Sequence, residues 1–189
     1  MVRIAAAHGY NSIVPSGPRE NRRSELRNPA SKNLDRLSAL EIVRLMNRED
    51  RKVPVAVGRA LPVIARAVDL IVHAIGGGGR LIYVGAGSSG RIAVLDAAEC
   101  PPTFGTSSQL VQTLIAGGGR AITRAVEGAE DSPANAERDL RKIKLTRNDV
   151  VTGICASGTT PYVLGGLRFA SKTGASTAIS MSMAPDRCA

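Results

Sequence analysis

From residue 80 onward, short apolar runs alternate with stretches of helical spacing, and this alternation restricts the fold most. The apolar runs have the length of β-strands and lie at 80–85, 110–116, 149–155 and 175–181. The stretches between them predict helices at 88–98, 119–127, 133–142 and 160–172. Strands separated by helices form a parallel sheet that is covered on both faces. The sequence therefore predicts an α/β fold, whose ligands bind at the carboxyl ends of the strands.

The part of the chain before the first strand predicts two helices, over 37–47 and 53–75. Ser38 and Glu41 have the spacing of a capping box at the first helix, and Pro62 predicts a kink in the second. We expect three regions: a basic leader without regular structure (1–30), a helical segment (31–78) and the α/β domain (79–189).

Composition narrows the classes of partner. The net charge is +9, but the chain has no Trp and only 3% aromatic residues, which argues against base stacking on nucleic acid. A charge excess spread along the chain suits small anionic substrates. No apolar run reaches the length of about 20 residues that spans a bilayer. Three cysteines without CxxC spacing are typical of reduced thiols in a cytoplasmic protein.

A glycine-rich loop follows the first strand and opens the next helix. Its sequence, GAGSSG at 85–90, formally matches the dinucleotide fingerprint, which also requires an acid at the end of the second strand. That strand ends in Ala116-Gly117-Gly118, without an acid. A phosphate monoester fits better, because Ser88 and Ser89 add hydroxyl donors to backbone N–H groups at a helix start. The alternative is a tight turn whose serines only cap the helix.

A second loop repeats this arrangement after the third strand, where Ser157, Thr159 and Thr160 precede a helix. Two hydroxyl-rich loops side by side would hold one phosphate from two sides.

Two acids are candidates for proton transfer. Glu99 is followed by Pro101 and Pro102, which we expect to end its helix and fix its backbone. Glu130 lies in the acidic cluster at 127–132. The alternative for each is a solvated acid at a helix end. The two histidines are isolated at His8 and His73, so neither an imidazole base nor a metal cluster is expected.

Several segments together resemble the N-acetylmuramic acid 6-phosphate etherase family, bacterial enzymes with a sugar isomerase (SIS) domain. The resemblance runs from Ser24 to Ser182, and the segments that carry it are RNPASKNLDRLSALEIVRLMNRED, LIYVGAGSSGR, LDAAECPPTFG, AVEGAED and ASGTTPYV. It implies a flavodoxin-like three-layer αβα sandwich of the SIS type. It also implies a bacterial cytoplasmic homodimer that uses no cofactor and no metal.

The resemblance implies cleavage of the ether between C3 of the sugar and D-lactate, by elimination and then addition of water. By motif, Glu99 resembles the proton donor of the family and Glu130 its second catalytic acid. The expected phosphate ligands are Gly87, Ser88, Ser89, Ser157 and Thr159.

Three alternatives remain open: a non-catalytic phosphosugar-binding regulator of the same fold, like the glucokinase regulatory protein, an inactive truncated etherase, and an aldose–ketose isomerase. Members of the etherase family continue beyond the end of this chain. We therefore expect a truncated domain that lacks a fifth strand, exposes a sheet edge and has reduced stability.

Overall fold

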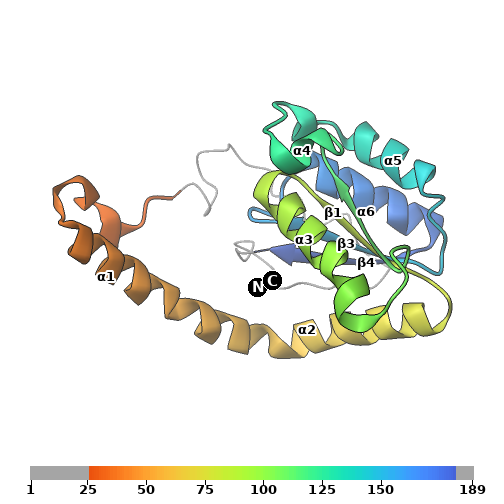
Figure 1. Ribbon diagram of the computed structural model, residues 1–189, viewed down its shortest axis with the longest axis horizontal. Helices are drawn as coiled ribbons and strands as arrows, with labels where there is room; N and C mark the ends of the chain where they lie inside the picture. Colours follow the sequence, from red (N-terminus) through yellow and green to blue (C-terminus); the bar gives the residue numbers. More distant parts are fainter. Residues whose placement is uncertain (1–25, 182–189) are drawn as a thin grey trace, which may run out of the picture.

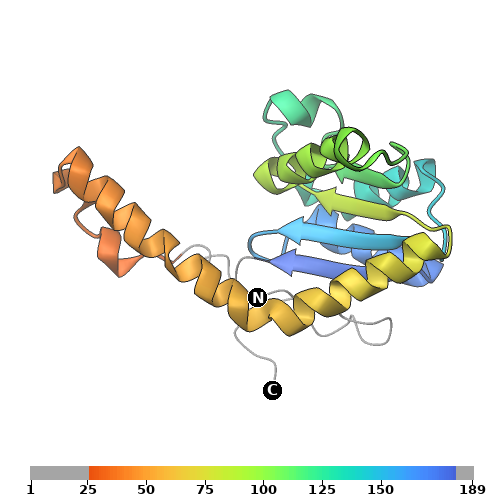
Figure 2. The same ribbon diagram turned by 60° about the horizontal axis from the view of Figure 1, so that its bottom comes forward.

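The computed structural model describes residues 26–181, which form an α/β body with a long helical arm (Figure 1). The arm begins with two short 3₁₀ turns, η4 (Pro29–Ser31) and η5 (Leu34–Arg36). It continues through α1 (Ala39–Asp50) and α2 (Lys52–Gly76), whose second half runs beside the body (Figure 2). The expected leader lies outside the described residues, apart from residues 26–30.

The start of the arm follows from local chemistry. The Glu41 carboxylate accepts from the Ser38 N–H at 2.8 Å, and the Glu41 N–H donates to the Ser38 hydroxyl at 3.4 Å. This reciprocal pair is the predicted capping box, and it begins α1 at Ala39. Pro62 lies inside α2, which continues through it to Gly76.

The body contains four parallel strands in the order β2-β1-β3-β4. Each boundary lies within one residue of the sequence prediction: β1 (Leu81–Gly85), β2 (Val111–Ile115), β3 (Val150–Cys155) and β4 (Ser176–Met181). Tyr83 in the middle of β1 is level with Thr113 on one side and Thr152 on the other. β1 and β3 are therefore neighbours, and their carboxyl ends meet at one edge of the sheet.

Helices cover both faces of this sheet, which confirms the predicted α/β sandwich. Helix α3 (Gly87–Phe104) packs on β1 and β2, while α5 (Pro133–Lys142) and α6 (Pro161–Thr173) pack on the opposite face (Figure 1). Because strand side chains alternate between faces, Ile82 and Val84 both point toward α6. The side chains of this face are fully buried in the main core: Ile82, Val84, Leu140, Val151, Tyr162 and Leu167.

Two helices of the α/β body differ from the prediction by more than one residue. Helix α3 continues through Pro101 and Pro102 to Phe104 and ends at Gly105, which has φ +66°. The prolines lie in its last turn, where each removes one N–H donor but still offers a carbonyl. The Pro101 carbonyl accepts from the Gly105 N–H at 2.9 Å. The prolines therefore do not end the helix directly after Glu99, and that expectation was wrong.

The second difference is α4 (Arg120–Thr123), for which the sequence predicted a helix over 119–127. At Arg124 the backbone becomes extended, and a separate 3₁₀ turn, η6 (Ala129–Asp131), follows.

Opposite the carboxyl edge, the Arg80–Asp149 pair joins the loops that precede β1 and β3. The Asp149 carboxylate accepts from the Arg80 backbone N–H, Nε and Nη2 at 2.9, 3.0 and 2.8 Å. It also accepts from the Thr146 N–H at 2.8 Å and is only 2% exposed. This pair fixes the start of two central strands and so holds their carboxyl ends in register.

Candidate functional site

The carboxyl edge of the sheet brings together most of the predicted site residues. Gly87, Ser88 and Ser89 follow β1 and form the first turn of α3. Ser157 and Thr159 follow β3 and precede α6. Because β1 and β3 are paired, these two loops are neighbours.

Close packing explains the glycines of the first loop. A Cβ on Gly90 would lie 2.7 Å from the Ile115 side chain and 3.1 Å from the Gly85 carbonyl carbon. Gly87 has φ +54°, a left-handed conformation that favours glycine. Gly85 and Gly90 thus allow the strand and the helix to come into contact, and Gly87 allows the turn between them.

The first-turn N–H groups of α3 have no side-chain cap. Its N-cap is Ala86, and neither Ser88 nor Ser89 takes the capping position. The alternative in which the serines only cap the helix therefore does not apply. Ser88 is exposed and Ser89 half-buried, and both lie in the first turn, at the positive end of an 18-residue helix.

Hydrogen bonds within the second loop organise it. The hydroxyl oxygens of Ser157 and Thr159 lie 2.8 Å apart, and the Thr159 N–H donates to Ser157 Oγ at 3.3 Å. The Cys155 sulfur accepts from the N–H groups of Gly158 and Thr160. Burial raises the pKa of the Cys155 thiol to about 11, although the two N–H donors act to lower it. Cys155 is therefore a neutral thiol that shapes the loop, a role that the sequence prediction missed.

Glu130 lies at the same edge, in η6. The chain reverses at Gly128, which has φ +68°, and Ser132 then caps α5 by accepting from the Asn135 N–H at 3.4 Å. η6 packs on α6, the helix that the second hydroxyl loop precedes. The Glu130 side chain is exposed. The structure thus places an accessible carboxylate on the side of the sheet that carries both loops.

A single chain does not bring Glu99 to the same place. Glu99 follows Ser89 by ten residues on one helix, a separation of about 15 Å along the helix axis. One turn before Glu99, Asp96 bonds the phenol of Tyr83 in the middle of β1. Glu99 therefore lies past the middle of the sheet, away from the carboxyl edge and from the glycine-rich loop.

Glu99 instead shares an exposed apolar face of α3. Ile92, Leu95 and Glu99 have the spacing of one helix face, and the two apolar side chains are 64% and 62% exposed. Phe104, at the end of the helix, is 75% exposed. Further exposed apolar side chains lie along the arm: Leu40, Val43, Met46, Val53, Val55, Val57, Leu61, Val68 and Val72. Apolar surface of this extent is typical of a protein–protein interface.

The sequence analysis predicted no role for Arg91, which lies two residues after Ser89. Its Nε donates to the Ala121 and Ile122 carbonyls at 3.0 and 3.1 Å, and its Nη2 donates to the Arg124 carbonyl at 3.1 Å. These bonds account for the early end of α4, because they satisfy carbonyls that further helical turns would otherwise occupy. The sequence feature that could have indicated a role for Arg91 is its position directly after the glycine-rich loop.

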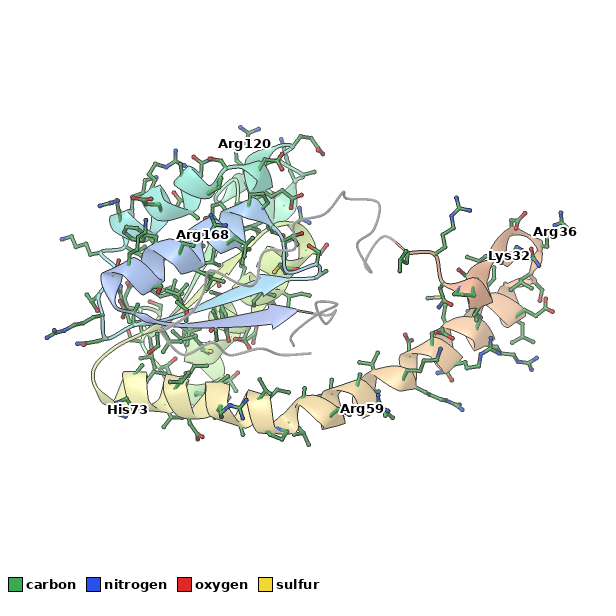
Figure 3. All side chains as sticks on the ribbon, turned by 180° about the vertical axis from the view of Figure 1, so that it is seen from behind. Lys32, Arg36, Arg59, His73, Arg120 and Arg168 are labelled. Atoms are coloured by element: carbon green, nitrogen blue, oxygen red, sulfur yellow. The ribbon has the colours of Figure 1, made fainter. Side chains whose placement is uncertain are left out.

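Basic side chains and possible metal ligands were compared over the rest of the described chain. The labelled basic residues in Figure 3 are spread from the end of the arm (Lys32, Arg36) to the body (Arg120, Arg168). Within residues 26–181, no three His, Cys, Asp or Glu side chains gather as metal ligands would. No helix in this range is long and apolar enough to cross a membrane.

Comparison with known families agrees with this geometry. Residues 63–171, more than half of the chain, match the family described as the glucokinase regulatory protein N-terminal SIS domain. The chain belongs to this SIS-domain family. The matched SIS domain includes the second half of α2 and every strand except β4.

Curated bacterial relatives of the SIS domain are named N-acetylmuramic acid 6-phosphate etherase. The protein of Vibrio vulnificus (strain YJ016) is 59% identical over 154 residues, which are 82% of this chain and 51% of the relative. The protein of Pectobacterium atrosepticum is 58% identical over 155 residues, again 82% and 51%. The Clostridium beijerinckii protein is 56% identical over 158 residues, 84% and 52%. The chain thus spans about half the length of these relatives.

A solved structure supports the SIS fold. Phosphoheptose isomerase GmhA from Neisseria gonorrhoeae superposes with a TM-score of 0.53 and covers 76% of each chain. At 16% identity, this similarity concerns the fold alone.

Proposed function

We propose that this SIS domain binds N-acetylmuramic acid 6-phosphate and takes part in cleaving its D-lactyl ether. The products are N-acetylglucosamine 6-phosphate and D-lactate, as in the recycling of peptidoglycan amino sugars. The observation that carries the proposal is the meeting of two hydroxyl loops beside the uncapped start of α3. The names of the curated relatives supply the substrate.

The phosphate is the anchoring group. Backbone N–H donors from Gly87 onward, with the Ser88 and Ser89 hydroxyls, bind it from the α3 side. Ser157 and Thr159 bind it from the β3 side. Ser157 is half-buried, whereas Thr159 is 9% exposed. Ser157 is therefore the stronger ligand of this pair, and Thr159 orients it through the 2.8 Å contact.

The two carboxyl groups divide the proton transfers. In the open-chain sugar, Glu130 takes the proton from C2 as the C2–C3 double bond forms and the C3–O bond breaks. Glu99 gives a proton to the departing lactate oxygen. Water then adds to the unsaturated aldehyde, with its hydroxyl on C3 and a proton on C2. No electrons are exchanged with another reagent, so these steps require no redox cofactor.

The position of Glu99 supports a site that is shared between two copies of the chain. A separation of about 15 Å along α3 exceeds the distance between the phosphate and C3 of one sugar. We propose a homodimer in which Glu99 of one subunit completes the site whose phosphate loops lie on the other. The apolar side chains of Ile92 and Leu95 beside Glu99 provide the contact surface. The cysteine pattern favours the cytoplasm as the location.

Release of D-lactate from N-acetylmuramic acid 6-phosphate tests the proposal, with Glu99→Gln and Glu130→Gln as controls. We expect lactate from the unmodified chain and a loss in both variants. Saturable phosphosugar binding without lactate would instead favour a non-catalytic regulator of the same fold. If the folded protein shows neither signal, both assignments are wrong.

A further inference from the structure

Arg91 links the first phosphate loop to the segment that carries Glu130. It lies on α3, two residues after Ser89, and its guanidinium reaches across to the end of α4. The three carbonyl acceptors are those of Ala121, Ile122 and Arg124, at 3.0–3.1 Å. One side chain therefore holds the last turn of α4 at three points.

The carbonyls of Ala121, Ile122 and Arg124 need hydrogen-bond donors from outside α4. At Arg124 the backbone is extended with φ −139° and ψ 153°, so the helix offers no further N–H groups to the carbonyls behind it. Arg91 is half-buried at this contact. The planar guanidinium presents several N–H donors in a fixed arrangement, which a lysine ammonium does not reproduce.

The held segment leads directly to the second acid. Glu130 follows Arg124 by six residues, and packing fixes the path between them. A Cβ on Gly117 would lie 3.0 Å from the Cβ of Val126, which shows how closely the segment packs on the end of β2. The Ala129 N–H donates to the Val126 carbonyl at 3.3 Å, and the Asp131 N–H donates to the Gly128 carbonyl at 3.2 Å. These contacts connect Arg124 to Glu130 through a packed, hydrogen-bonded segment.

We propose that Arg91 is a positioning residue, which sets Glu130 at a fixed distance from the phosphate loop. The inference rests on the proposed function. It adds to that function that Arg91, a basic residue close to the first phosphate loop, positions the acid Glu130 and does not bind the phosphate. Nε and Nη2 both donate to backbone carbonyls of this segment, which is the observation that favours a positioning role.

The test compares Arg91→Gln and Arg91→Lys with Arg120→Gln, a matched control. Arg120 is an exposed arginine on α4 itself, at the outer surface of the body (Figure 3). Three quantities are measured: kcat and KM for lactate release, the Kd for glucosamine 6-phosphate, and hydrogen exchange of the amides from 121 to 131. Thermal melting of each variant shows that it is folded.

For Arg91→Gln we expect a fall in kcat of about 100-fold, because a displacement of about 1 Å costs that much. The Kd for glucosamine 6-phosphate should stay within about 2-fold, and amides 121–131 should exchange faster. Arg91→Lys should regain part of the kcat. Adding Arg91→Gln to Glu130→Gln should cause little further loss, since both changes act on one step.

The proposal is overturned if Arg91→Gln leaves both kcat and exchange unchanged. It is also overturned if the Kd weakens by as much as kcat falls, because Arg91 would then bind the phosphate. If Glu130→Gln keeps full activity, the proposed role of Glu130 fails, and the exchange measurement still reports whether Arg91 holds the segment. If the chain releases no lactate at all, the exchange and Kd measurements still separate the positioning role from phosphate binding.

Discussion

Gly85 and Gly90 approach so closely that a Cβ on Gly85 would lie 2.8 Å from the Gly90 Cα. The end of β1 and the start of α3 therefore touch through their backbones. This contact points the first turn of α3 outward at the carboxyl edge of the sheet. The glycines at 85 and 90 are thus explained by strand–helix packing, whatever ligand the loop binds.

Gly90→Ala should destabilise the protein by about 1–3 kcal/mol, because the added methyl group meets Ile115 and the Gly85 backbone. Urea denaturation measures the change. Gly58→Ala is the control: Gly58 lies inside α2, where an added methyl group would have no heavy atom within 4 Å, and alanine there should stabilise the helix. Equal stability of Gly90→Ala and the unmodified chain would contradict the packing argument.

Asp149 should make stability depend on acid pH. Burial acts to raise the pKa of Asp149, but hydrogen bonds from Arg80 and Thr146 outweigh it and hold the pKa below its ordinary value. A lowered folded pKa contributes stability that is present above the unfolded pKa of about 3.9 and is lost as pH falls through the folded value. Asp149→Asn should cost about 1.5–3 kcal/mol at pH 7, because it removes the charge that pairs with Arg80 and accepts its hydrogen bonds.

Denaturation curves between pH 7 and pH 2.5 check this dependence. The stability difference between Asp149→Asn and the unmodified chain should shrink toward the acid end. Glu137→Gln serves as the control, because the Arg141–Glu137 pair is exposed and such pairs contribute about 0–1 kcal/mol. A pH-independent difference would show that the carboxylate charge is not involved.

Mixing two inactive variants tests whether the site is shared between subunits. Glu99→Gln removes the proton donor, and Ser157→Ala removes a phosphate ligand from the second hydroxyl loop. In randomly mixed dimers of a composite-site enzyme, half are hybrids with one intact site each, so activity should recover to about a quarter of the unmodified value. If both functions lie within one subunit, mixing restores nothing, and D-lactate release distinguishes the two results.

The sulfur of Cys155 should affect phosphosugar affinity without touching the ligand. Cys155→Ala leaves the N–H groups of Gly158 and Thr160 without their acceptor, a cost of about 1 kcal/mol that corresponds to roughly a 5-fold weaker Kd. Cys155→Ser keeps an acceptor and should bind nearly as tightly as the unmodified chain. Calorimetric titration with glucosamine 6-phosphate measures both. Equal affinity of the alanine and serine variants would show that an acceptor at position 155 does not affect phosphosugar binding.

Local patterns were enough to predict much of this fold. The strand boundaries were predicted within one residue, because short apolar runs bounded by polar and glycine residues have few alternatives in a sheet covered on both faces. Ser38 and Glu41 predicted the start of α1, since both partners of a capping box lie within four residues. The hydroxyl loops were predicted for the same reason, as each is a contiguous segment at a helix start.

Contacts between distant residues were outside the reach of those patterns. α4 ends early because Arg91 donates to it from another helix, and α3 continues past Pro101 because the remaining carbonyls still form its last turn. The position of Glu99 combines both levels. The helix predicted over 88–98 already separates Ser89 from Glu99, because a helix advances about 1.5 Å per residue. Only the packing of α3 on the sheet, where Asp96 bonds Tyr83 in the middle of β1, shows that this separation leads away from the carboxyl edge.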